Sequence, residues 1–160
     1  MKKIEIITRA LILKGNKPGS RKNSLPGKIL LCKMKEDRHY FLPGGRVEFG
    51  ESARSALSRE LKEEMGVKSE TGSLVGVCEH KYREKSKKYH EINLIFNTKI
   101  EKMNLKSEEK KLKFYLKDLK EFKNIYFLPK NLKTALFNYF KNKKFFYIGL
   151  TSGVKPSKKT

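Results

Sequence analysis

Residues 42–67, LPGGRVEFGESARSALSRELKEEMGV, join a glycine turn to a segment with helical periodicity. Ser52 is a suitable N-cap and Gly66 a suitable helix stop, so the sequence predicts a helix between them. At roughly 100° per residue, the small and apolar side chains of this helix form one inward stripe. Its members are Ala53, Ala56, Leu57 and Leu61. The stretch therefore predicts an amphipathic helix that is entered through a glycine turn.

Three glutamates disturb the apolar side of this helix. Glu60 and Glu64 fall inside the stripe and Glu63 lies at its edge. Their spacing of i, i+3 and i+4 makes the carboxylates converge on one face. Like charges that face inward repel each other and resist desolvation, and a hard divalent cation removes both problems. Mg²⁺ is the expected ion, and Mn²⁺ is an alternative. The competing interpretation of the three glutamates is an ordinary charged helix end, at which they pair with Arg59 and nearby lysines.

The spacing of the polar residues matches a known motif. Its fixed positions in this chain are Gly45, Glu51, Arg59-Glu60-Leu61, Glu63-Glu64 and Gly66-Val67. They fill the whole Nudix box, G-x5-E-x7-REU-x-EE-x-GU with U apolar, at residues 45–67. The chain therefore resembles the Nudix hydrolase family, whose members include the MutT-like proteins.

This resemblance implies a fold and a reaction. The expected fold is α/β: an α/β/α sandwich with a mixed, partly antiparallel sheet between helices. The expected reaction is divalent-metal-dependent hydrolysis of a diphosphate bond in a nucleoside diphosphate joined to another group. Glu60, Glu63, Glu64 and the Gly45 carbonyl are expected to hold the metal ion. Arg59 is expected to orient the glutamates, because a bidentate arginine–carboxylate pair fixes their rotamers.

Further candidates lie outside the box. Many family members take a base from a glutamate outside the box helix, so the expected catalytic residues are Glu63, Glu91 and Arg59. Glu108 and Glu109 are reserves for Glu91, and His90 beside it is either a site residue or a structural histidine. The expected substrate-binding residues are Arg9, on the first strand, and Tyr82, Arg83 and Tyr89, which the sequence places in a polar loop at 81–89. A solvent-facing arginine and a solvated loop are the alternatives.

The remaining segments predict one domain over residues 1–150. Strands are expected at 4–14, 28–35, 46–49, 73–78, 90–96, 111–116 and 145–148, and a second helix at 130–142. Residues 15–27 predict a mobile loop, and the basic tail at 151–160 is expected to be disordered. Cys32 and Cys78, the two cysteines, are expected to be buried free thiols of a reducing compartment, so the cytoplasm is the expected location. The sequence has no run of about 18 apolar residues, so no membrane span is expected.

The charge balance leaves the substrate open. Lysine and arginine outnumber aspartate and glutamate by 38 to 17, giving a net charge of +21. Such a balance favours polyanionic partners, although lysine enrichment also follows from an AT-rich genome. A small nucleotide, such as a normal or oxidised nucleoside triphosphate, is the broadest expectation. The alternatives are the 5′ end of RNA and a non-catalytic Nudix module that binds a nucleotide or a partner; a homodimer is compatible with each.

Overall fold

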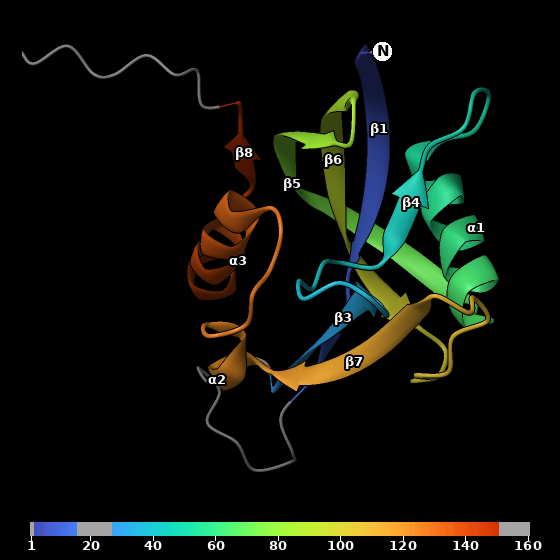
Figure 1. Ribbon diagram of the computed structural model, residues 1–160. Helices are drawn as coiled ribbons and strands as arrows, with labels where there is room; N and C mark the ends of the chain where they lie inside the picture. Colours follow the sequence, from blue (N-terminus) through green and yellow to red (C-terminus); the bar gives the residue numbers. More distant parts are fainter. Residues whose placement is uncertain (1, 16–26, 151–160) are drawn as a thin grey trace, which may run out of the picture.

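The computed structural model describes residues 2–15 and 27–150; the expected loop and tail, at 16–26 and 151–160, lie outside the described residues. The elements along the chain are β1 (Lys2–Leu11), β2 (Leu13–Lys14), β3 (Lys28–Met34), β4 (Gly44–Arg46), α1 (Ala53–Met65), β5 (Ser69–Glu84), β6 (Lys87–Ile100), β7 (Leu112–Asp118), α2 (Leu119–Phe122), α3 (Lys130–Asn142) and β8 (Phe146–Ile148). Figure 1 shows α1 on one side of the strands and α2 and α3 on the other.

The strands form two sheets. The larger is mixed, with the order β4-β1-β6-β5-β8, and the smaller has the order β2-β3-β7. In the larger sheet β1 runs parallel to β6 and antiparallel to β4, whereas β5 is antiparallel to β6. The expected α/β sandwich with a mixed sheet is confirmed. The single strand expected at 4–14 is interrupted at Ile12, whose carbonyl accepts from Leu30 on β3, so that β2 joins the smaller sheet.

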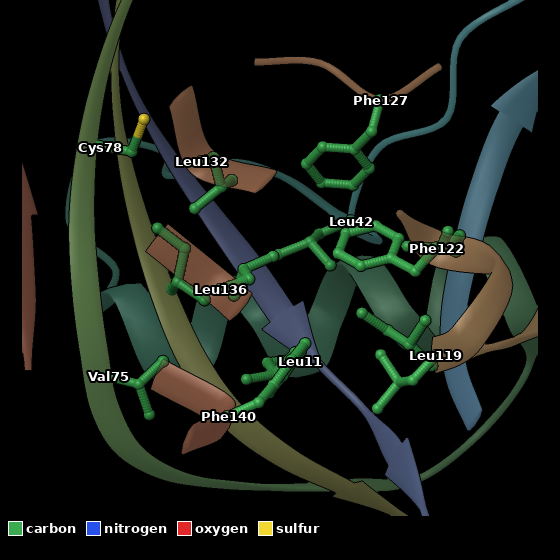
Figure 2. Close-up of a cluster of buried hydrophobic side chains, with 13 residues drawn as sticks. Leu11, Leu42, Val75, Cys78, Leu119, Phe122, Phe127, Leu132, Leu136 and Phe140 are labelled. Carbon is green, nitrogen blue, oxygen red and sulfur yellow. The ribbon is translucent and has the colours of Figure 1, made fainter. Parts of the chain in front are cut away.

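Two apolar clusters hold the helices against the strands. One lies beneath α1 and includes Leu57, Leu61 and Met65. The other, drawn in Figure 2, packs Leu132, Leu136 and Phe140 of α3 against β1 and β5. Burying one large apolar side chain contributes about 1.5–3 kcal/mol, so these clusters fix both helices relative to the sheet. The cluster beneath α1 thus packs this helix against β1 and β6.

The prediction of a loop at 81–89 was wrong. β5 continues to Glu84 and β6 begins at Lys87, so the two strands close in a two-residue turn with Lys85 at a φ of 52°. Tyr82 and Tyr89 face each other across the hairpin, and their rings stack 4.9 Å apart. Both strands project into solvent here, so their polar side chains resemble those of a loop, while cross-strand aromatic pairing stabilises the hairpin.

Two smaller expectations also changed. The short strand expected at 46–49 lies at Gly44–Arg46 instead, because Glu48 already begins a turn that ends in a hydrogen bond from Glu51 N. α2 was not expected at all. Cys32 and Cys78 are free and buried, as predicted. Within residues 2–15 and 27–150, none of the helices has the length and apolar character needed to span a membrane.

Candidate active site

The start of α1 has the local structure that its sequence predicts. The Ser52 hydroxyl caps the helix by accepting a hydrogen bond of 3.1 Å from Ser55 N. Gly66 ends the helix in a left-handed conformation, with φ at 65°, and its N–H donates to Lys62 O. These caps set the register of the glutamates on α1 relative to the glycine turn before it.

Two glycines bring the backbone close to its neighbours at this turn. Gly44 has a φ of 131°, and a Cβ placed there would collide with the carbonyl of Thr8 on β1. A Cβ on Gly45 would collide with the carboxylate of Glu60. Only glycine lets the backbone approach both the neighbouring strand and a carboxylate this closely. The Gly45 backbone and the Glu60 carboxylate are therefore direct neighbours.

Arg59 binds three carboxylates near the turn. Its guanidinium binds Glu51 through two hydrogen bonds of 2.7 and 3.2 Å, and also lies 3.0 Å from Glu60 and 3.3 Å from Glu63. Its remaining donor binds Arg46 O at 3.0 Å. The hydrogen bond from Arg59 lowers the pKa of Glu51. This network fixes the positions of three box glutamates relative to β4. It agrees in part with the alternative interpretation of a charged helix end whose glutamates pair with Arg59.

Glu64 stands outside that network. Only 7% of the residue is exposed, and its Oε2 has no hydrogen-bond partner. Burial raises the pKa of Glu64 to about 8; nearby Arg9 acts against this shift, whereas Glu60 and Glu109 add to it. Burial also raises the pKa of Glu60. A buried carboxylate oxygen without a partner, next to other carboxylates, suits a bound cation. The positive charge of the cation would stabilise the ionised carboxylate, which burial disfavours.

The carboxylates are not yet gathered around one point. In the described part of the chain, no three His, Cys, Asp or Glu side chains are arranged to hold a metal ion. Glu60 and Glu63 each accept a hydrogen bond from Arg59 Nη1. The donors needed for a metal site are thus present on one helix face, with Arg59 competing for two of them.

A cavity of about 470 Å³ opens beside this turn. Its lining includes Arg9, Phe41, His80, Tyr82, Arg83 and Glu91. The Arg9 guanidinium lies 5.5 Å from the centre of the Phe41 ring and donates to Leu42 O at 3.1 Å. It also lies 3.4 Å from Gly44 O. Arg9 therefore lines the cavity and also contacts the glycine turn that packs against Glu60.

The cavity brings together most of the residues expected to bind substrate. Arg9, Tyr82 and Arg83 line it, whereas Tyr89 supports it from behind by stacking on Tyr82. His80, which the sequence did not suggest, stacks on the same Tyr82 ring at 5.4 Å. Burial lowers the pKa of His80, which favours the neutral form of its ring and suits an aromatic wall.

The two groups of proposed bases lie in different places. Glu91 lies on the cavity wall, where it accepts a 3.0 Å hydrogen bond from the Tyr82 hydroxyl. His90 pairs instead with Glu79 at 3.0 Å. Glu109 acts electrostatically on both Glu60 and Glu64. Glu108 has its carboxylate near Gly66, at the end of α1.

Comparisons with known proteins agree with this arrangement. The family model described as the NUDIX domain matches residues 21–142. The chain therefore belongs to the Nudix family, as its box at residues 45–67 predicted. Among solved structures, the MutT protein from Methanosarcina mazei Go1 aligns with a TM-score of 0.64 at 23% identity, over 89% of this chain and 96% of that one. That likeness shows the fold.

Curated relatives match over shorter stretches. An ADP-ribose pyrophosphatase from Methanocaldococcus jannaschii is 39% identical over 72 residues, which are 43% of this chain and 41% of the relative. The nucleoside triphosphatase NudI of Escherichia coli is 51% identical over 45 residues, or 25% of this chain and 32% of the relative. The chain thus aligns with less than half of the length of either relative.

Proposed function

We propose that this protein is a divalent-metal-dependent Nudix pyrophosphohydrolase acting on a diphosphate bond in a nucleoside diphosphate derivative, with nucleoside triphosphates as the broadest class. The observation that carries the proposal is the unpartnered, buried Oε2 of Glu64 on the box helix, and an aromatic cavity lined by Arg9 supports it. A buried carboxylate without a partner costs stability, which a bound cation would restore. The cavity volume of about 470 Å³ lies within the range of small-molecule sites.

The metal ion would be held by Glu60, Glu63, Glu64 and the Gly45 carbonyl. Mg²⁺ is the proposed ion, with Mn²⁺ as the alternative, because both take oxygen ligands. When bound, such an ion neutralises the charge of the diphosphate and polarises its phosphorus–oxygen bonds. Arg59 acts as a positioning residue, since it binds Glu60 and Glu63 together with Glu51.

We assign the proton acceptor to Glu109 ahead of Glu63 and Glu91. Burial is the main cause of the raised pKa of Glu60 and of Glu64, and the charge of Glu109 adds to both shifts. Glu63 is paired with Arg59, and Glu91 is bonded to Tyr82 on the cavity wall. A base must reach the water that attacks phosphorus, so proximity to the glutamate cluster favours Glu109.

The cavity would bind the nucleoside. His80, Tyr82 and Tyr89 form a continuous aromatic stack, and Tyr82 and His80 face the cavity, where a base can pack on them. Arg9 and Arg83 add positive charge near the expected phosphates. Two curated relatives are named as an ADP-ribose pyrophosphatase and a nucleoside triphosphatase. The substrates in both names contain a nucleoside diphosphate unit, which supports this substrate class.

The decisive experiment is a substrate panel with Mg²⁺. It contains normal and oxidised nucleoside triphosphates, ADP-ribose, diadenosine polyphosphates and 5′-triphosphate RNA, with released phosphate and pyrophosphate as the readout. We expect hydrolysis of small nucleotides that EDTA and Glu64→Gln abolish, while Glu70→Gln, at an exposed glutamate outside the site, retains it.

Other outcomes of the panel would change the assignment. Because the net charge is +21, the 5′ end of RNA is the second candidate, and preferential, salt-sensitive cleavage of the RNA substrate would establish it. Binding of nucleotides without any turnover would identify a non-catalytic module instead.

Two further properties belong to the proposal. Cys32 and Cys78 are buried free thiols, which supports a reducing compartment, and we propose the cytoplasm. A homodimer is the proposed alternative to a monomer, and light scattering of the purified protein distinguishes them.

A further inference from the structure

Four side chains form a continuous hydrogen-bonded chain along the cavity wall. Arg9 Nε donates to Asn93 Oδ1 at 3.2 Å, and Asn93 Nδ2 donates to Glu91 Oε2 at 3.4 Å. The Tyr82 hydroxyl donates to Glu91 Oε1 at 3.0 Å. The residues come from β1, β5 and β6, and Asn93 is 1% exposed. The chain therefore ties three neighbouring strands to one carboxylate.

The direction of every donor in this chain is fixed. An arginine side chain can only donate, so Asn93 must present its oxygen to Arg9 and its amide NH₂ to Glu91. Glu91 then receives one hydrogen bond on each of its carboxylate oxygens. A group in this position acts solely as an acceptor, and it holds its rotamer because both oxygens are bonded.

Glu91 keeps capacity for a ligand. Two carboxylate oxygens offer about four acceptor positions in total, of which the two protein donors occupy one on each oxygen. Glu91 is half-buried and lines the cavity beside Tyr82. Glu5, which lies next to it on β1, is already ion-paired with Lys3 at 2.6 Å and Arg46 at 2.8 Å. Glu91 is thus an oriented acceptor next to an aromatic surface.

We propose that Glu91 is a specificity-determining residue that accepts a hydrogen bond from the exocyclic amino group of the nucleobase. This inference rests on the proposed function, in that the cavity receives the base of a nucleotide. Cytosine and adenine present an amino group where uracil and hypoxanthine present a carbonyl oxygen. The carboxylate attracts the amino group and repels the carbonyl oxygen, so the enzyme selects amino-bearing bases.

The expected selectivity is about tenfold or more between two nucleotides of which one carries the amino group and the other a carbonyl oxygen in its place. A carboxylate held in place as an acceptor disfavours an analogue that presents a carbonyl oxygen, because the hydrogen bond is lost and the two oxygens repel each other. The pairs CTP with UTP and ATP with ITP make this exchange while each keeps the size and stacking surface of its base. The neighbouring ring nitrogen changes with it, from an acceptor to an N–H donor.

The test compares kcat/KM for these four nucleotides in the wild type and three variants. Glu91→Gln keeps the shape but replaces one acceptor by a donor, so the amino preference should disappear or invert. Tyr82→Phe keeps the stacking ring but loses the hydroxyl that orients Glu91, so the preference should weaken. Glu70→Gln removes an exposed carboxylate outside the cavity and should keep the wild-type ratio. Thermal unfolding verifies that all variants are folded.

Two results would overturn the inference. The first is equal or better use of UTP and ITP by the wild type. The second is a Glu91→Gln variant in which kcat falls by the same factor for all four nucleotides, which would indicate a general base or a structural role. If the wild type hydrolyses none of them but cleaves another member of the substrate panel, nucleoside triphosphates are excluded as substrates; if it cleaves nothing in the panel, the proposed function fails. The dissociation constants of their α,β-methylene analogues then decide the Glu91 inference separately, by the same ratios.

Discussion

The carboxylate of Glu60 lies directly against the backbone of Gly45, so closely that no side chain can be added at position 45. Gly45 lies on a three-residue strand and Glu60 in the middle of α1. This contact joins the turn to the helix at the point where the proposed metal site is built. The close approach therefore serves the site, in addition to the fold.

Gly45→Ala should displace the Glu60 carboxylate and lower kcat/KM at least about tenfold, since small displacements at a preorganised site have large effects. The added methyl group meets an acidic side chain and not backbone atoms, so the protein should still fold. Steady-state kinetics and thermal unfolding measure the two effects. Gly15→Ala is the matched control, because a Cβ at Gly15 meets nothing within 4 Å; equal kinetics for both variants would contradict the role of the contact.

The stability of the metal-free protein should fall as the pH rises from about 4.5 to about 8. Burial raises the pKa of Glu64 to about 8 in the folded state, whereas the unfolded chain has the ordinary value of about 4.3. A raised folded pKa means that the folded state binds the proton more tightly. Its contribution is therefore complete below the unfolded pKa and is lost as the pH approaches the folded one.

Urea unfolding in EDTA at pH 5, 6.5 and 8 measures this loss, which is on the order of 2–4 kcal/mol for a single group with such a shift. Glu64→Gln should flatten the pH dependence of the unfolding free energy. At pH 8, Mg²⁺ should raise the unfolding free energy of the wild type but have little effect on that of the variant. Parallel pH profiles for the two proteins would show that Glu64 is not the responsible group.

Arg59→Lys should weaken the site without unfolding it. Lysine keeps the charge but cannot form the paired hydrogen bonds to Glu51 at 2.7 and 3.2 Å while also reaching Glu60. Loss of a residue that orients metal ligands commonly costs about 10–100-fold in metal affinity or activity. Calorimetric titration with Mg²⁺ and kcat provide two readouts. Unchanged values in both would remove Arg59 from the machinery.

Leu136→Ala tests the packing of α3 against the sheet (Figure 2). Leu136 is fully buried in the cluster that contains Leu11 and Val75. Truncation of such a leucine leaves a cavity and costs about 2–5 kcal/mol of unfolding free energy. Ile4→Ala, at a side chain that is 69% exposed, should cost much less. Chemical denaturation of both variants gives the comparison.

The part of the site carried by α1 could be predicted from the sequence because it depends on short-range geometry. The caps at Ser52 and Gly66 and the spacing of Glu60 and Glu64 are properties of a single helix. The hairpin near Tyr82 could not be predicted in this way, because its polar strands extend past the core and lack an apolar face. The partnership of Arg9 with Asn93 joins residues 84 positions apart, and depends on the register of β1 against β6.

The same distinction applies to the proposed bases. Glu91 and Glu109 both follow the box helix, and nothing local to either residue indicates its distance from Glu64. Their different places arise from the three-dimensional arrangement of β6 and of the segment before β7. Paired variants, Glu109→Gln and Glu91→Gln, should separate the two roles, with a uniform loss of kcat for the first and an altered nucleotide preference for the second.

The most direct measurement of the central claim is the Mg²⁺-dependent turnover of the preferred nucleotide by the wild type and by Glu64→Gln. The buried carboxylate of Glu64 is the group whose loss should matter most, because its Oε2 has no partner in the protein. We expect turnover to fall at least about 100-fold in a variant that remains folded, as for the loss of one preorganised charge-stabilising group. A folded variant with wild-type turnover would contradict the assignment of the metal site.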